Sequence, residues 1–181
     1  MPPNSAILIV AGVLLSAPAS ADMPPQPYAG QQIRAIKALS DDDVGALRRG
    51  EGLGMAKAAE LNGYPGPAHV LALADKLGLT DAQRRQVAAI HDRMSAAARR
   101  IGHDLIERER TLDQLFSDND AKQDRIAVET AAIGALQGKL RAVHLTAHVE
   151  TRSLLTADQI SLYQHLRGHG GPAESRQHSH G

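Results

Sequence analysis

The chain has no cysteine and no tryptophan, and its only aromatic residues are one phenylalanine and three tyrosines. Without cysteine there can be neither a disulfide nor thiol chemistry. So few aromatic side chains disfavour a β-sandwich, stacking on nucleic-acid bases and an aromatic-lined small-molecule pocket. The formal net charge is zero, from 20 basic and 20 acidic residues, which argues against a general nucleic-acid binder. What remains for the core is Leu, Ile, Val and much Ala, a composition that suits close-packed helices.

The first 21 residues have the pattern of a cleaved secretory signal peptide. Residues 6–15 (AILIVAGVLL) form an apolar run that is too short to span a bilayer, and Ala19-Ser20-Ala21 supplies an A-x-A cleavage site. No other stretch is apolar enough for a membrane span, so we expect export to the periplasm without stable membrane insertion. The length then predicts one domain.

Composition divides the remaining chain into three parts. Residues 22–38 are rich in Pro and Gln at their start and predict a flexible leader that turns helical near Gln31. Residues 39–167 carry the helical patterns. Residues 168–181 are rich in Gly, His and Ser and predict a disordered tail.

A five-residue pattern occurs twice, as Leu79-Thr80-Asp81-Ala82-Gln83 and as Leu155-Thr156-Ala157-Asp158-Gln159. In each copy the threonine can cap a helix by accepting from a free backbone N–H of the first turn. The glutamine three residues later can reach back to the cap's own N–H, which completes a capping box. An acidic residue in the first turn suits the positive end of the helix dipole. Both copies therefore predict helix starts, at Asp81 and at Ala157.

Two long helices are predicted between these boxes. The first runs from Asp81 to Phe116, about 54 Å at the helical rise per residue, with apolar residues at steps of three and four. The polar break 117–120 follows. The second runs from about Ala121 to Leu154, with apolar residues at seven-residue steps (Ile126, Ile133, Leu140, Ala147, Leu154). This pattern predicts an antiparallel, coiled-coil-like pair.

Shorter helices are expected before the pair. Ser40 followed by three aspartates predicts an N-cap, and residues 55–61 and 69–77 read as helices. Pro67 can occupy the first helical position of the second of these, and Gly78 fits its end. We interpret Gly50, Gly52 and Gly54 as a hinge. The fold class is therefore all-α, a long antiparallel hairpin with shorter flanking helices. Since one apolar stripe per helix covers one side only, the shorter helices, a second protomer or both must cover the rest.

The paired boxes, the signal sequence and the helical hairpin resemble the Spy/CpxP family. The resemblance covers roughly residues 39–167. It implies small periplasmic stress proteins: ATP-independent chaperones, envelope-stress regulators and related zinc- and heavy-metal-responsive proteins. It further implies a curved, cradle-like homodimer whose concave face holds unfolded clients, and it does not imply an enzyme. The chain departs from the best-studied chaperones in being neutral rather than basic, and in the glycine-rich turns between its N-terminal helices.

Histidine is the one enriched reactive residue type, with nine copies. His144 and His148 are four residues apart on one predicted helix, so both imidazoles could reach a single metal ion. The alternative, which we favour for this pair, is two surface histidines beside the apolar seam. His165, His169, His178 and His180 belong to a C-terminal run that could bind Zn, Ni or Cu loosely or remain a neutral polar tail. His69, His91 and His103 are interpreted as structural or exposed. A metal site would also need a carboxylate, for which Glu150 is the nearest candidate on the same helix.

A second candidate surface combines basic and apolar side chains. On the two long helices it comprises Arg84, Arg85, Arg93, Met94, Arg99, Arg100 and Arg141. Such a face could hold unfolded chains weakly, by long-range attraction followed by apolar contact. The alternative for any single arginine is a solubilising role.

No catalytic constellation is present, and no cofactor is required by any motif in the chain. The leading hypothesis is a non-enzymatic periplasmic protein that binds unfolded or misfolded envelope proteins. The alternatives are a divalent-metal (Zn, Ni or Cu) sensor or buffer, and a regulatory partner of a membrane stress sensor. We expect a homodimer in each case.

Overall fold

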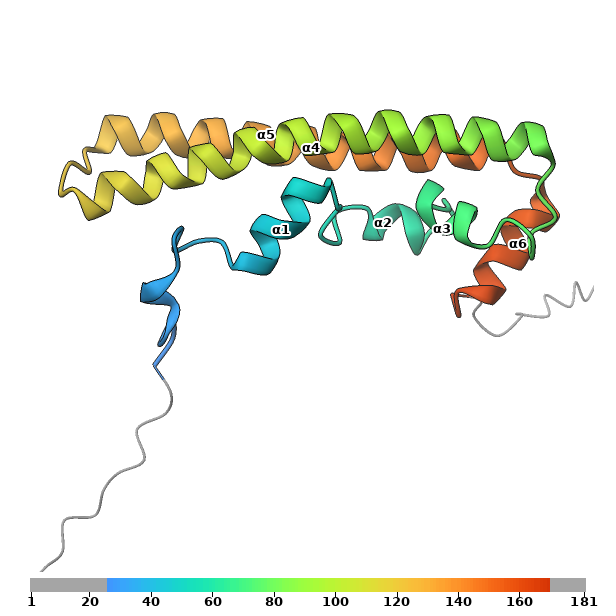
Figure 1. Cartoon of the computed structure of the whole chain (residues 1–181), viewed down its shortest axis with the longest axis horizontal. Coiled ribbons are helices and arrows are strands. Elements are labelled where there is room, and N and C mark those ends of the chain that lie inside the picture. Colours follow the sequence, from blue (N-terminus) through green and yellow to red (C-terminus); the bar gives the residue numbers. More distant parts are fainter. Residues whose placement is uncertain (1–25, 170–181) are drawn as a thin grey trace, which may run out of the picture. The chain divides into compact units, whose positions relative to one another are not determined.

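The computed structural model describes residues 26–169 (Figure 1). Residues 26–32 belong to a separate compact unit, in which a turn leads into a short 3-10 helix, η1 (Gln31–Ile33). All other elements belong to the second unit. The predicted signal peptide at 1–21, most of the leader's proline-rich start, and His178 and His180 lie outside the described residues.

Six α-helices make up the second unit, and the all-helical prediction is confirmed. They are α1 (Asp41–Arg49), α2 (Lys57–Glu60), α3 (Pro67–Ala72), α4 (Asp81–Ser117), α5 (Gln123–Ser153) and α6 (Ala157–Leu166). In the described part of the chain there is no strand, only an isolated bridge between Ile36 and Leu39. No helix among residues 26–169 is both long and apolar enough to cross a membrane.

The helix starts follow the capping chemistry that the sequence predicts. Ser40, Thr80 and Thr156 are all extended N-caps whose hydroxyls accept from the backbone N–H three residues on. In each case the side chain of that third residue accepts in return from the N-cap's own N–H, which closes a capping box. These three boxes therefore set where α1, α4 and α6 begin.

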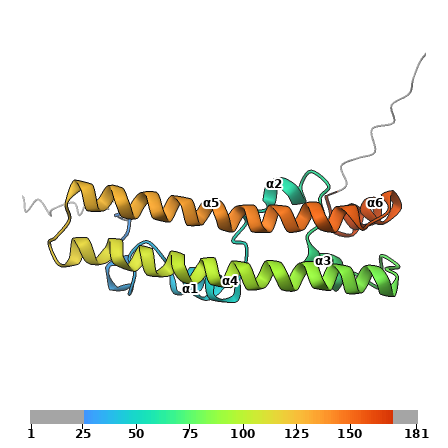
Figure 2. The same ribbon diagram turned by 90° about the horizontal axis from the view of Figure 1, so that it is seen from above.

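Helices α4 and α5 form the antiparallel hairpin, and α1 to α3 lie along one side of it (Figures 1 and 2). The connection 118–122 turns at Asn119, which has a positive φ of 57°. One buried cluster joins α1 to the hairpin through residues that include Leu47, Leu105 and Leu140. A second cluster joins α3, α4 and α6 around Val70, Val87 and Tyr163. The hairpin is thus covered on one side by the short helices.

The short elements differ from their predicted bounds. The helix expected at 55–61 is reduced to the single turn of α2. Pro67 is the first residue of α3, as predicted, but the helix expected to reach Leu77 ends at Ala72. Residues after Ala72 continue as hydrogen-bonded turns, because burying Leu77 and Leu79 against α4 and α6 requires the chain to bend.

The three glycines interpreted as a hinge occupy defined positions. Gly50 ends α1 in the left-handed conformation, and its α-carbon lies against the carbonyl of Ser95 on α4. Gly52 lies against the ring of His144. At least two of the three are therefore packing positions, where a larger residue would not fit.

Candidate functional site: a histidine-lined cavity

A cavity of about 560 Å³ lies between the α1–α3 segment and the hairpin, open to solvent on one side. Its apolar walls include Leu53, Leu61 and Met94. Five histidines from four separate parts of the chain also line it: His69, His91, His144, His148 and His169. The fold therefore concentrates most of the described histidines in one place.

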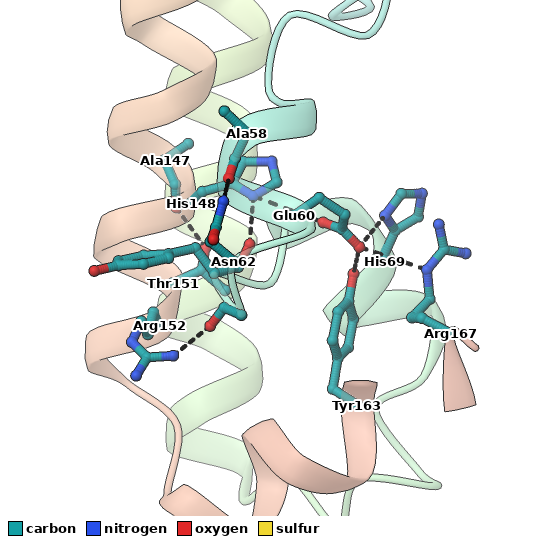
Figure 3. A network of polar contacts seen from close by, with 12 residues as sticks. Ala58, Glu60, Asn62, His69, Ala147, His148, Thr151, Arg152, Tyr163 and Arg167 are labelled. Atoms are coloured by element: carbon teal, nitrogen blue, oxygen red, sulfur yellow. Dashed lines mark hydrogen bonds and ion pairs between the residues drawn. The ribbon is translucent and has the colours of Figure 1, made fainter. Parts of the chain in front are cut away.

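Glu60, at the end of α2, is the carboxylate around which the polar groups gather (Figure 3). Its Oε1 accepts a hydrogen bond from the buried Tyr163 hydroxyl and lies 3.5 Å from Arg167 Nε. The same oxygen is 3.7 Å from His69 Nδ1 and 4.0 Å from His169 Nδ1. Glu60 thereby connects α2 with α3 and with the C-terminal helix.

The second oxygen of Glu60 faces α5. Glu60 Oε2 is 3.7 Å from His148 Nδ1, is buried, and has no hydrogen-bond partner. His148 Nδ1 lies 2.7 Å from the carbonyl oxygen of Tyr64. Because a carbonyl only accepts, Nδ1 carries the proton, and in the neutral ring Nε2 is left with a free lone pair. His148 is therefore held in a tautomer that can accept a proton or bind a cation at Nε2.

Two glycines make room for these imidazoles. A Cβ on Gly66 would lie 2.8 Å from His148 Cε1, and one on Gly52 would lie 3.2 Å from His144 Nδ1. The backbone thus packs directly on both rings, which leaves His144 and His148 only 5% and 8% exposed. A larger residue at position 52 or 66 would push a ring out of place.

Burial shifts the pKa values of three groups at this site, His69, His144 and Tyr163. It lowers the pKa of His144, with a smaller contribution from the neighbouring His148, because desolvation disfavours the charged imidazolium. Burial and the Arg167 guanidinium likewise lower the pKa of His69. Burial, followed by the hydrogen bond to Glu60, raises the pKa of Tyr163 well above its ordinary value. His69 and His144 are therefore favoured as neutral rings, the form that binds metal ions.

The interpretation of His144 and His148 as surface residues is wrong. In an isolated pair of helices both positions would lie beside the seam and face water, but here the α1–α3 segment covers them. The carboxylate beside His148 is Glu60 rather than Glu150, which pairs instead with Arg93 at 2.9 Å. His169 joins the site, whereas His165 is exposed on α6. Only the tertiary fold brings Glu60 and His69 to this place, since neither shows a helical spacing with His148.

The structure does not gather the predicted client-binding residues on one face. Arg84 pairs with Asp75, Arg93 with Glu150, and Arg99 donates to Ser95. Arg85 and Arg100 are exposed on α4. Two members of the set do lie beside α2: Met94 lines the histidine cavity, and Arg141 lines a neighbouring groove of about 490 Å³.

The two capping boxes touch each other, which their sequences did not indicate. Gln83 Nε2 donates to Gln159 Oε1 at 2.9 Å and to the carbonyl of Leu154 at 2.8 Å. Gln159 Nε2 donates in return to Gln83 Oε1 and to the carbonyl of Leu77, both at 3.3 Å. Each glutamine thus completes its own cap and also binds the other box, while Leu79 and Leu155 pack into one buried cluster.

Comparison with known proteins identifies a family over the segment that holds both boxes. Residues 68–167, more than half of the chain, match the model of the LTXXQ motif family. No curated protein and no solved structure matches the chain. The matched segment begins in α3 and ends just after α6, so it contains both boxes and the whole hairpin. This chain therefore belongs to the LTXXQ motif family of Spy/CpxP-type, stress-related proteins, which are typically periplasmic.

Proposed function

We propose that this protein is a non-enzymatic periplasmic stress protein that binds unfolded or misfolded envelope proteins without a nucleotide. The observation that carries the proposal is a pair of exposed leucines beside α2. Leu53 and Leu61 are 45% and 55% exposed and line both the histidine cavity and the neighbouring groove. Together the two hollows offer an apolar surface to an extended chain.

Leu53 also has an unfavourable backbone conformation. Its φ is 45°, in the left-handed region that side chains other than Gly and Asn rarely adopt. An exposed leucine there contributes little to stability, so its presence is better explained by what it contacts on binding. Lys57 and Arg141 border the same groove without an ion pair in the described structure, so acidic residues in a client would find counter-charges.

Suppression of aggregation of a chemically reduced client tests this function. Leu53→Asn with Leu61→Gln should weaken suppression several-fold, while Leu53→Asn by itself leaves folding intact because Asn tolerates a positive φ. Phe116→Gln, which removes an exposed apolar residue at the far end of α4, is the matched control and should keep full activity. Absence of suppression by the unmodified chain at several-fold molar excess contradicts the proposal.

A second candidate function, binding of a divalent transition metal, is supported by unpaired groups in the cavity. Glu60 Oε2, His144 Nε2 and His169 Nδ1 are buried without hydrogen-bond partners. Carboxylate and imidazole donors suit Zn, Ni or Cu. Within residues 26–169, however, no three such side chains stand close enough to hold an ion. Binding would therefore require the side chains around Glu60 to move.

Calorimetric titration with Zn, Ni and Cu separates the two functions. Metal binding at this place should be lost in Glu60→Gln and His148→Ala but kept in Leu53→Asn with Leu61→Gln. Deleting residues 170–181 tests the predicted contribution of the tail. Binding that survives Glu60→Gln and vanishes with the tail would place the metal outside the cavity.

A further inference from the structure

One nitrogen atom in the wall of the histidine cavity is a hydrogen-bond acceptor that the described chain leaves free. His148 Nδ1 donates to the carbonyl of Tyr64, so the lone pair of the neutral ring is on Nε2. No group among residues 26–169 hydrogen-bonds to Nε2. His148 is only 8% exposed, and Figure 3 shows its ring on α5 beside Glu60. The cavity is therefore bordered by a nearly buried acceptor of known tautomer.

Gly66 keeps this nitrogen uncovered. It is the N-cap of α3, with φ −80° and ψ 143°, a conformation that any residue can adopt. Ser, Thr, Asn or Asp at this position would also supply a side-chain cap for α3. A Cβ at position 66, however, would lie 2.9 Å from His148 Nε2. Glycine thus forgoes the side-chain cap and leaves the lone pair accessible from the cavity, which Gly66 and His148 both line.

The charges around the cavity exclude most kinds of donor. Arg49 pairs with Glu51 at 2.6 Å. Arg167 pairs with Glu60 at 3.5 Å, so Lys57 carries the unbalanced charge of the described lining when the histidines are neutral. This positive charge disfavours a lysine, an arginine or a free amino terminus of a bound chain. A carboxylate has no proton to donate at neutral pH. The donor that suits His148 is therefore a neutral one.

The apolar walls identify the neutral donor. Leu53, Leu61 and Met94 line the same space, whose volume of about 560 Å³ is large enough for an aromatic side chain. An indole combines a large apolar body with an N–H that donates and does not accept, so its burial leaves no acceptor unpaired. A phenol or an amide would also bring an acceptor of its own. The thioether of Met94 makes a favourable contact with an aromatic ring.

We propose that the cavity is a pocket for a tryptophan side chain of an unfolded client, with the indole N–H donating to His148 Nε2. This inference rests on the proposed client binding and names the residue that a client inserts. Leu53 and Leu61 border both this pocket and the neighbouring groove, so the chain on either side of the tryptophan has an apolar surface to continue along.

The chain contains no tryptophan, which makes such a ligand directly observable. N-acetyl-tryptophanamide should bind the full chain with a blue shift of its fluorescence. The compound methylated at the indole nitrogen keeps both rings but has no N–H. It should bind about tenfold more weakly, because it leaves His148 Nε2 unpaired. Saturating N-acetyl-tryptophanamide should also reduce the suppression of client aggregation, since it occupies the pocket.

A variant of His148 tests the acceptor itself. In His148→Asn the side-chain amide can still donate to the carbonyl of Tyr64, but the acceptor at Nε2 is gone. This variant should bind the two compounds with equal, weak affinity and keep its helicity by circular dichroism. His165→Asn, exposed on α6, is the matched control and should keep the tenfold preference.

Equal affinity of the unmodified chain for the two compounds would overturn the inference, as would a tenfold preference that persists in His148→Asn. The comparison of the two compounds needs no variant, so it decides the matter even if His148→Asn does not fold. Suppression of aggregation without a preference for the indole N–H would overturn the pocket and leave the proposed function standing. Preference for the indole without suppression would support the pocket and contradict the proposed function.

Discussion

The two helices of the hairpin bury similar inner faces, but their outer faces differ in composition. On α4, residues that remain exposed include Arg85, Asp92, Arg100 and Glu107, the ordinary solvated surface of an amphipathic helix. On α5, the exposed positions between Val128 and Val149 are largely Ala, Gly and Val. The outer face of α4 is therefore an ordinary charged surface, whereas that of α5 leaves small apolar side chains exposed.

The largest effect should come from the buried face of α5, which packs in the hairpin. Leu140 is 1% exposed and belongs to the cluster that joins α1 to the hairpin. Leu140→Ala should therefore lower the free energy of unfolding by about 3 kcal/mol, from lost burial and the remaining cavity. Arg100→Ala, on the exposed face of α4, should leave it unchanged within error. Urea denaturation measures both, and equal effects would contradict the assignment of these faces.

A glycine-to-alanine substitution should change the free energy of unfolding in opposite directions on the two helices. A Cβ on Gly102 of α4 would lie 2.5 Å from the carbonyl oxygen of Leu47, so Gly102→Ala should destabilise by about 2 kcal/mol as α1 is pushed away. Gly138→Ala on α5 meets open space and should stabilise a single copy by about 1 kcal/mol. Both are measured by urea denaturation at the same protein concentration. A destabilising Gly138→Ala would mean that α5 is packed there within one chain.

Removing the contact between the two boxes should lower the free energy of unfolding more than removing a single helix cap. Gln83→Ala removes the return bond of its own cap and the bonds to Leu154 and Gln159, and should cost about 2 kcal/mol. Thr80→Ala removes mainly the cap and should cost about 1 kcal/mol. A double-mutant cycle of Gln83→Ala with Gln159→Ala measures the coupling. Strict additivity of the two losses would argue that the boxes act separately.

The smallest expected effect is a change in how the free energy of unfolding depends on pH. Burial lowers the pKa of His144 below the value of about 6.5 that it has in the unfolded chain. Above pH 6.5 both states are neutral; below it the unfolded chain binds a proton that the folded chain does not, so stability falls as pH decreases. His144→Asn on α5 should reduce the loss of stability between pH 7 and pH 5. His103→Asn, exposed on α4, should not change it.

Local chemistry made the helices predictable, and long-range packing decided the rest. The boxes at Thr80 and Thr156 marked two helix starts correctly because capping involves only residues within one turn. Heptad spacing identified the two long helices because that repeat is set by residues within each helix. The length of α2 and the end of α3 depended on docking against α4 and α5, which has no sequence period.

The candidate site was predicted less well than the fold. The spacing of His144 and His148 placed two imidazoles together, but it could not show that Gly52 and Gly66 would cover them. Glu60 is 88 residues from His148 in the chain and joins it only through the fold. Arg84 and Arg93 form ion pairs with Asp75 and Glu150, which lie outside their own helix and which a helical wheel does not contain, whereas Arg99 donates to Ser95 on the same helix.

The pairing of Gln83 with Gln159 also affects how the first turns of α4 and α6 unfold locally. Since each glutamine supports the cap of one helix and binds the box of another, neither cap can be lost without exposing the other. Backbone amides in the first turns of α4 and α6 should therefore show one common free energy of opening in native-state hydrogen exchange, as a single cooperative unit. The far end of the hairpin, at 118–122, has no such link and should exchange faster.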